Sequence, residues 1–141
     1  MIKIEYSELL TELREVARDA GSEIMKIYES SFDVNYKGDG SPVTLADQAA
    51  EKLILSQLKK IIPDIPIVSE ENASSHELEA GNQFFLIDPL DGTKEFLKKD
   101  GLGSFTVNLG LIENGIPTLG VVFAPALNRM FFASNLTGAF E

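Results

Sequence analysis

The spacing of apolar residues changes along this chain from the period of a helix to that of a strand, and this change most limits its possible folds. From Ser7 to about Ser30 apolar residues recur every three or four positions, which predicts a helix with one buried face. A similar face from about Thr44 to Ile61 predicts a second helix. Later segments are short and apolar, or alternate, as strands do. Helices followed by strands predict an α+β fold.

The expected strands lie in the second half of the chain, at residues 67–69, 84–87, 105–111, 119–123 and 130–133. Asn114-Gly115 is a strong hairpin signal between two of them. We expect these strands to form a mostly antiparallel sheet, with the two N-terminal helices packed on it. Residues 32–36 predict a short extended piece. Residues 72–82 predict a polar loop containing His76, to which we assign no role.

The stretch Asp88-Pro-Leu-Asp-Gly-Thr-Lys-Glu-Phe96 directly follows a buried apolar run and is the most informative one for function. Pro89 restricts Asp88 to extended geometry, and Gly92 admits backbone angles closed to other residues. We expect the strand to end at Asp88, and the carboxylates of Asp88 and Asp91 to face one point. Mg²⁺ prefers oxygen ligands and combines carboxylates with phosphate oxygens, so the stretch predicts a partial magnesium site. Asp-Pro and Asp-Gly are also ordinary turn dipeptides.

A second predicted strand is also followed directly by acidic residues, because Glu70 and Glu71 come after Ile67-Val-Ser69. Two strands that end in carboxylates predict one shared acidic site. A pair of glutamates at a strand end is commonly just solvated, so this prediction depends on the combination with Asp88 and Asp91.

Three motifs together resemble the inositol monophosphatase superfamily of Mg²⁺-dependent, lithium-sensitive phosphatases. They are Ser41-Pro-Val-Thr-Leu-Ala-Asp47, Val68-Ser-Glu-Glu71 and the Asp88–Phe96 stretch. Within that family the chain is most similar to the CysQ branch, the 3'(2'),5'-bisphosphate nucleotidases, in which Lys94-Glu95 is typical after the Asp-Gly-Thr. The resemblance implies the N-terminal half of the layered αβαβα sugar-phosphatase fold.

The resemblance also implies a set of metal ligands. Glu70, Asp88 and the backbone carbonyl of Leu90 would hold a first Mg²⁺, which activates a water. Asp88 and Asp91 would hold a second, which stabilises the leaving oxygen. Carboxylates and carbonyls are hard oxygen ligands, which suits this role.

The remaining implied roles concern the water and the phosphate. Thr93 would orient the attacking water, with Asp47 as its hydrogen-bonded partner, so that Asp47, Glu70 and Thr93 form the catalytic group. Asp91 and the backbone amides near Gly92 and Thr93 would contact the substrate phosphate. Asp47 also has a purely structural interpretation, because it follows Thr44 at the spacing of a capping box and an acid is favoured near a helix start.

The chain departs from the family in length. Family members are nearly twice as long, and their second half supplies a Trp-Asp motif that completes the metal site, whereas this sequence contains no tryptophan. We therefore interpret residues 1–141 as the N-terminal metal-binding domain, without the C-terminal domain. The family pattern predicts an incomplete site for this domain alone, and an uncovered sheet face that favours self-association or pairing with the missing half.

Charge and composition exclude several function classes. The chain carries 22 acidic and 12 basic residues, a formal net charge of −10, which argues against binding to nucleic acid or an anionic membrane. Bound Mg²⁺ would make the local field positive for a phosphate substrate. The sequence has no cysteine, so thiolate metal sites are excluded, and no apolar run has the length of a membrane span. Cytoplasm is the expected compartment.

Two classes of function follow from these observations. The first is a Mg²⁺-dependent phosphatase that acts on a small phosphorylated nucleotide such as adenosine 3',5'-bisphosphate, with inositol phosphate as the alternative substrate. The second is a non-catalytic fragment that only binds metal or a partner chain. Lys94, Lys98 and Lys99 are expected to solubilise the surface, with attraction of a phosphate as the alternative.

Overall fold

The computed structural model describes residues 5–30, 42–70, 82–98 and 103–141 of the chain. In chain order the described elements are α1 (Tyr6–Tyr28), α2 (Pro42–Ile61), β1 (Ile67–Ser69), β2 (Gln83–Asp91), α3 (Thr93–Lys98), β3 (Thr106–Glu113), β4 (Ile116–Ala124), β5 (Arg129–Ser134) and β6 (Gly138–Phe140). The extended piece predicted at 32–36 and His76 lie outside the described residues.

The described strands form one sheet in the order β1-β2-β3-β4-β5-β6. Strand β1 runs parallel to β2, and all other neighbours are antiparallel. The β3–β4 hairpin turns at Asn114 and Gly115, which both have a positive φ, of 53° and 79°, as a two-residue hairpin loop requires. The predicted α+β fold with a mostly antiparallel sheet is therefore confirmed, and β6 is an additional strand.

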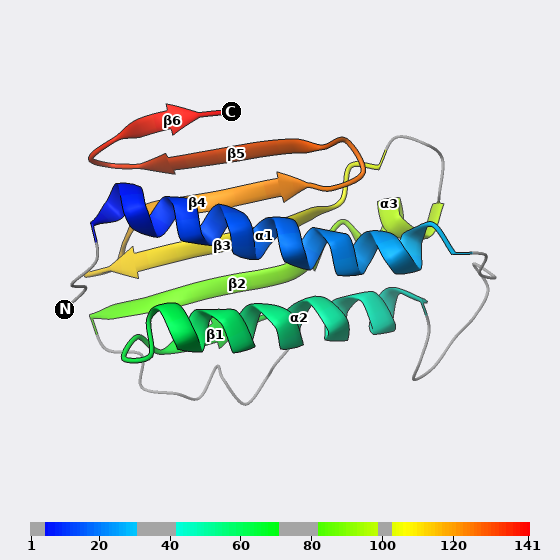
Figure 1. Cartoon of the computed structure of the whole chain (residues 1–141), viewed down its shortest axis with the longest axis horizontal. Helices are drawn as coiled ribbons and strands as arrows, with labels where there is room; N and C mark the ends of the chain where they lie inside the picture. The colour runs from blue at the N-terminus through cyan, green and yellow to red at the C-terminus, as the bar shows by residue number, and fades with distance from the viewer. Residues whose placement is uncertain (1–4, 31–41, 71–81, 99–102) are drawn as a thin grey trace.

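Helices α1 and α2 lie side by side on the same face of the sheet (Figure 1). Their buried residues follow the predicted helical spacing, and they pack against the inward-facing residues of β2, β3 and β4 to form a single core. Helix α1 comes very close to β4, because a Cβ atom on Gly21 would lie 2.5 Å from the Phe123 ring. None of the described helices combines the length and apolar character needed to cross a membrane.

An aromatic cluster closes the core at the end of the sheet where β2 leads into α3. Phe96 of α3 and Phe105, just before β3, are fully buried, with their ring centroids 5.3 Å apart in an edge-to-face arrangement. Tyr28, at the end of α1, contacts both rings at 5.4 and 4.7 Å. The cluster thus joins the end of α1 to α3 and to the segment just before β3.

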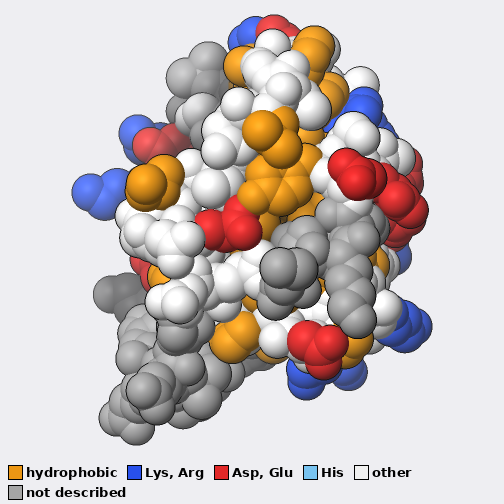
Figure 2. Space-filling view, turned by 90° about the vertical axis from the view of Figure 1, so that its left-hand side faces the viewer, with side chains coloured by type: hydrophobic (Ala, Val, Ile, Leu, Met, Phe, Trp, Pro, Cys, Tyr) orange, Lys and Arg blue, Asp and Glu red, His pale blue; other side chains and the backbone are white. Residues whose placement is uncertain are grey.

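Polar contacts anchor the start of α1 at the opposite end of the sheet. The Glu113 carboxylate accepts hydrogen bonds from the hydroxyls of Tyr6 and Thr118 and from the Gln83 amide. Figure 2 shows the molecule from the end at which α1 begins: basic side chains are scattered over this face, interspersed with acidic groups and a central apolar patch. Among the described residues seen from this side, the basic side chains do not form a continuous patch of the kind that binds nucleic acid.

Candidate metal centre

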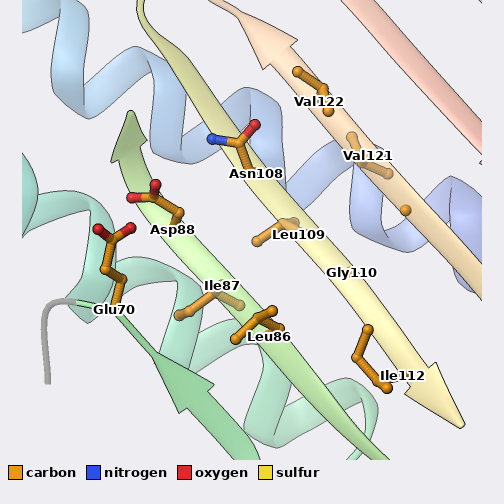
Figure 3. A pocket seen from close by; sticks show the side chains of 11 residues that line it. Glu70, Leu86, Ile87, Asp88, Asn108, Leu109, Gly110, Ile112, Val121 and Val122 are labelled. Atoms are coloured by element: carbon orange, nitrogen blue, oxygen red, sulfur yellow. The ribbon is translucent and has the colours of Figure 1, made fainter. Parts of the chain in front are cut away.

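The parallel pairing of β1 with β2 brings Glu70 next to Asp88. Ser69 pairs with Ile87, and the Glu70 N–H donates to the Ile87 carbonyl oxygen at 3.1 Å, which continues the ladder by one residue. Glu70, the residue after β1, therefore lies beside Asp88 of β2. Figure 3 shows their carboxylates side by side at this edge. Because parallel strands end on the same side of a sheet, two acids that are 18 positions apart in sequence meet there.

A β-bulge follows Asp88. Asp88 pairs with Asn108 and Asp91 with Thr106, so Pro89 and Leu90 on β2 oppose one residue on β3. Proline has no N–H to donate to a ladder, which explains why the pairing is interrupted here. The prediction that the strand ends at Asp88 was wrong, because β2 continues to Asp91. Leu90 is buried within the bulge.

Gly92 forms the connection from β2 to α3, whose first residue is Thr93. Gly92 has φ of 90°, and an added Cβ would lie 3.1 Å from the Phe105 Cα, so both backbone angle and space favour glycine. Its carbonyl oxygen accepts the first helical bond, from the Phe96 N–H, at 3.0 Å. Asp91 and Thr93 are exposed on either side of this glycine. Sequence reasoning did not predict α3, although the acid in its first turn and the lysine in its last turn are helix signals.

Asp47 lies within α2 and not at its start. The helix begins at Pro42, where a proline is well tolerated because the first N–H groups of a helix lack intrahelical partners. Asp47 is therefore the sixth residue, beyond the first turn, and the capping interpretation was wrong. Its side chain is 7% exposed. Since α2 packs against β2 and α3, this buried carboxyl belongs to the helix that borders the elements carrying Asp88 and Thr93.

Glu70 and Asp88 line one end of a groove of about 540 Å³ on the sheet face that α1 and α2 do not cover. Asn108 lies beside them on β3 (Figure 3) and was not predicted as a site residue. Its amide is held by Thr106, whose hydroxyl donates to Oδ1 at 3.2 Å and whose carbonyl accepts from Nδ2 at 3.3 Å. The sequence could have indicated this residue, because Asn108 is a polar residue at an outward position of a strand in which apolar inward residues alternate with outward ones.

The structure brings together two of the expected ligands but not a complete set. Within the described ranges, no group of three Asp, Glu or His side chains could hold a metal ion. Asp91 thus does not join Glu70 and Asp88 in one cluster. Two adjacent carboxylates nevertheless suit Mg²⁺, which commonly binds one or two carboxylates and completes its octahedron with water and phosphate oxygens. Lys94 and Lys98 are exposed on α3.

Comparisons with known proteins agree with this architecture. The model of the inositol monophosphatase family matches residues 5–141. The 3'(2'),5'-bisphosphate nucleotidase CysQ of Salmonella typhimurium is 46% identical over 130 residues, which cover 90% of this chain and 52% of that protein. The chain thus spans about half the length of the curated relatives it matches, in their N-terminal part.

Solved structures share the fold. The crystal structure of CysQ from Bacteroides thetaiotaomicron is 34% identical, with a TM-score of 0.81 over 95% of this chain and 48% of that one. An inositol monophosphatase from Anabaena is 27% identical, with a TM-score of 0.72 over 94% of this chain and 44% of that one. Both comparisons match one half of a longer protein.

Proposed function

Because this chain belongs to the inositol monophosphatase family, we propose that it is the metal-binding half of a Mg²⁺-dependent phosphatase that removes the 3'-phosphate of adenosine 3',5'-bisphosphate. The observation that carries the proposal is the pair of Glu70 and Asp88 carboxylates at the common end of β1 and β2. The choice of a nucleotide substrate is supported by the 46% identity to a bisphosphate nucleotidase.

Glu70, Asp88 and the backbone carbonyl of Leu90 are proposed to hold a first Mg²⁺, and Asp88 and Asp91 a second. Glu70 and Asp88 supply adjacent carboxylates, the bulge at Leu90 offers a backbone carbonyl that is not used in regular pairing, and Asp91 follows directly. Mg²⁺ held there would polarise a phosphoryl oxygen and lower the pKa of a water. The carboxylates bind hard cations because their oxygens are charged and poorly polarisable.

Asp47 and Thr93 are proposed to position the attacking water. A threonine hydroxyl donates one hydrogen bond and accepts others, so Thr93 can donate to Asp47 while it accepts from a water. The burial of Asp47 in α2 suits this role, because a carboxylate held in a packed helix is preorganised. Asp91 and Thr93 are exposed on either side of Gly92, and the backbone N–H groups near Gly92 and Thr93 are proposed to donate to the substrate phosphate.

The proposal requires a way to bind a phosphate ester to a chain of net charge −10. The two carboxylates of the groove repel an anion when no cation is bound. A divalent cation between them reverses the sign of the local field, whereas the global charge is screened beyond about 8 Å at physiological salt. Phosphate binding should therefore depend strictly on the divalent cation.

The test is Mg²⁺-dependent phosphate release from adenosine 3',5'-bisphosphate. It is measured for the chain alone and for the chain fused to the part of the Salmonella relative that lies beyond the match. We expect release by the fusion, loss of release in Asp91→Ala, and retention in Asp64→Asn, which changes an exposed acid in the turn after α2. If the fusion and its Asp91→Ala variant release phosphate equally slowly, the enzyme proposal is wrong.

The same assay separates the alternatives. Release from inositol 1-phosphate but not from the nucleotide would assign the chain to the inositol branch, which the resemblance to the Anabaena structure supports as second candidate. Metal binding without release in any form would assign it a non-catalytic role. The half-length match is the observation that favours this last outcome for the chain alone.

A further inference from the structure

Asn108 is an unusual residue for its place in the sheet. It lies in the interior of β3, and its partners across the ladders are Asp88 on β2 and Val122 on β4. Asparagine is depleted in strands, because its side chain offers the backbone alternative hydrogen bonds. The next outward positions on β2 and β3 carry Leu86 and Gly110, which have no polar side chain. A residue that breaks a local preference in this way is expected at a functional site.

Asp88 has Glu70 on one side and Asn108 on the other. Strand β2 lies between β1, which Glu70 follows, and β3, where Asn108 pairs directly with Asp88. Residues paired across antiparallel strands have Cβ atoms about 4.5–5.5 Å apart. Figure 3 shows the Asn108 amide on the side of Asp88 that is away from Glu70, with its nitrogen turned toward β2. An amide donor therefore faces Asp88 from the side that Glu70 does not occupy.

Two hydrogen bonds to Thr106 fix the orientation of this amide. The Thr106 carbonyl can only accept, so the atom of Asn108 that faces it, at 3.3 Å, is Nδ2. The Thr106 hydroxyl donates to Oδ1 at 3.2 Å. An amide nitrogen carries two N–H groups, so one of them remains for a second acceptor after the bond to Thr106.

The same two residues of β3 lie opposite two of the proposed metal ligands. Asn108 pairs with Asp88 and Thr106 with Asp91, on the two sides of the β-bulge in β2. The hydrogen bonds between Thr106 and Asn108 therefore join the positions of β3 that face both carboxylates. A bulge interrupts the ladder, so the backbone fixes the side chains of β2 less firmly here than in a regular pair. Side-chain contacts from β3 can supply this missing restraint.

We infer that Asn108 is a positioning residue for the candidate metal centre, held by Thr106 and acting through Asp88. In the metal-bound state its remaining N–H donates to the Asp88 carboxylate, which keeps this carboxylate in one orientation beside that of Glu70. Hydrogen-bond partners that orient metal ligands commonly change metal affinity by about 10–100-fold. The inference rests on the proposed function, because it concerns the same metal centre.

A role of Asn108 as a direct metal ligand fits the geometry less well. A cation would bind the amide oxygen, but Oδ1 already accepts from the Thr106 hydroxyl. Figure 3 shows this oxygen on the side of the amide away from Asp88. The nitrogen, which faces β2, carries hydrogens and repels a cation. The arrangement therefore favours a hydrogen bond to a ligand over ligation.

The test is a double-mutant cycle on Mn²⁺ affinity, measured for the chain from the electron paramagnetic resonance signal of free Mn²⁺. Asn108→Ala should weaken binding by about tenfold or more. Because Asn108 acts through Asp88, the same change should have no further effect in an Asp88→Asn background. It should still weaken binding in a Glu70→Gln background. The melting temperature of each variant is measured in parallel to establish that it is folded.

Thr106 supplies a matched pair of variants that leaves Asn108 in place. Thr106→Val keeps the branched shape but removes the hydroxyl that holds Oδ1, and it should weaken Mn²⁺ binding. Thr106→Ser keeps the hydroxyl and should bind Mn²⁺ as the unaltered chain does.

Two results would overturn the inference without affecting the proposed function. The first is an unchanged Mn²⁺ affinity in folded Asn108→Ala or in Thr106→Val. The second is a loss of affinity on Asn108→Ala that is equally large in the Asp88→Asn background, because this result would make Asn108 an independent ligand. Absence of saturable Mn²⁺ binding to the unaltered chain would instead contradict both the inference and the proposed metal centre.

Discussion

Truncation of Phe96 should be among the most damaging single changes, because this side chain connects α3 to the core. The six-residue α3 is far too short to be stable alone, so it depends on its tertiary contacts. Phe96 is fully buried and packs against Phe105 and Tyr28. Replacement of a buried phenylalanine by alanine costs about 3–5 kcal/mol, and each lost aromatic pair contributes about 0.5–1.5 kcal/mol of specific interaction, which places Phe96→Ala toward the upper end of that range.

Urea unfolding followed by circular dichroism measures this loss. With a slope of about 2 kcal/mol/M, a loss of 3–5 kcal/mol lowers the unfolding midpoint by about 1.5–2.5 M. Leu136→Ala is the control, because Leu136 is 76% exposed and its truncation should change the free energy of unfolding by no more than about 0.5 kcal/mol. A midpoint shift below about 0.5 M for Phe96→Ala, at unchanged slope, would refute the role of this residue as the anchor of α3.

Three further changes test other parts of the structure. Gly21→Ala should destabilise the chain by about 1–3 kcal/mol in urea unfolding, because the new methyl group would overlap the Phe123 ring, whereas a gain in stability would show that α1 can move away. Glu113→Ala removes the acceptor for three donors and should cost about 1–3 kcal/mol by the same assay; a loss below about 0.5 kcal/mol would contradict this. The Arg129 guanidinium holds the pKa of the exposed Glu141 carboxyl below its usual value, so any stability from this pair is present above the usual pKa and is lost as pH falls through the lowered one. High salt should abolish this pH dependence, and its persistence in 1 M NaCl would contradict the assignment.

The fold was largely predictable because its apolar pattern is regular. The residues of α1 and the alternation in β3 and β4 determine which side faces the core, and Asn114-Gly115 specifies the hairpin between these strands. Strand β1 was located correctly and β2 was located correctly except for its end, and their parallel pairing explains why Glu70 and Asp88 meet. The proximity of Glu70 and Asp88 depends on the register between β1 and β2, and the sequence pattern of each strand indicates this register only indirectly.

The features that the sequence did not predict depend on competing local signals or on tertiary contacts. Asp88-Pro89 suggested the end of a strand, but a β-bulge accommodates the proline, so β2 continues to Asp91. Thr44 suggested a helix cap, but Pro42 already adopts helical geometry and moves Asp47 into the second turn. The short helix α3 depends on burial of Phe96, and the role of Asn108 in lining the groove appears only when β3 lies next to β2.

The most direct test of the candidate metal centre is a calorimetric titration of the chain with Mn²⁺ and Mg²⁺. We expect saturable binding that weakens by about tenfold or more in Glu70→Gln and in Asp88→Asn, because each change removes a charged ligand. Asp64→Asn removes one negative charge from an exposed turn and should bind as the unaltered chain does. Equal uptake by all four proteins would contradict the account, as would the absence of saturable binding to the unaltered chain.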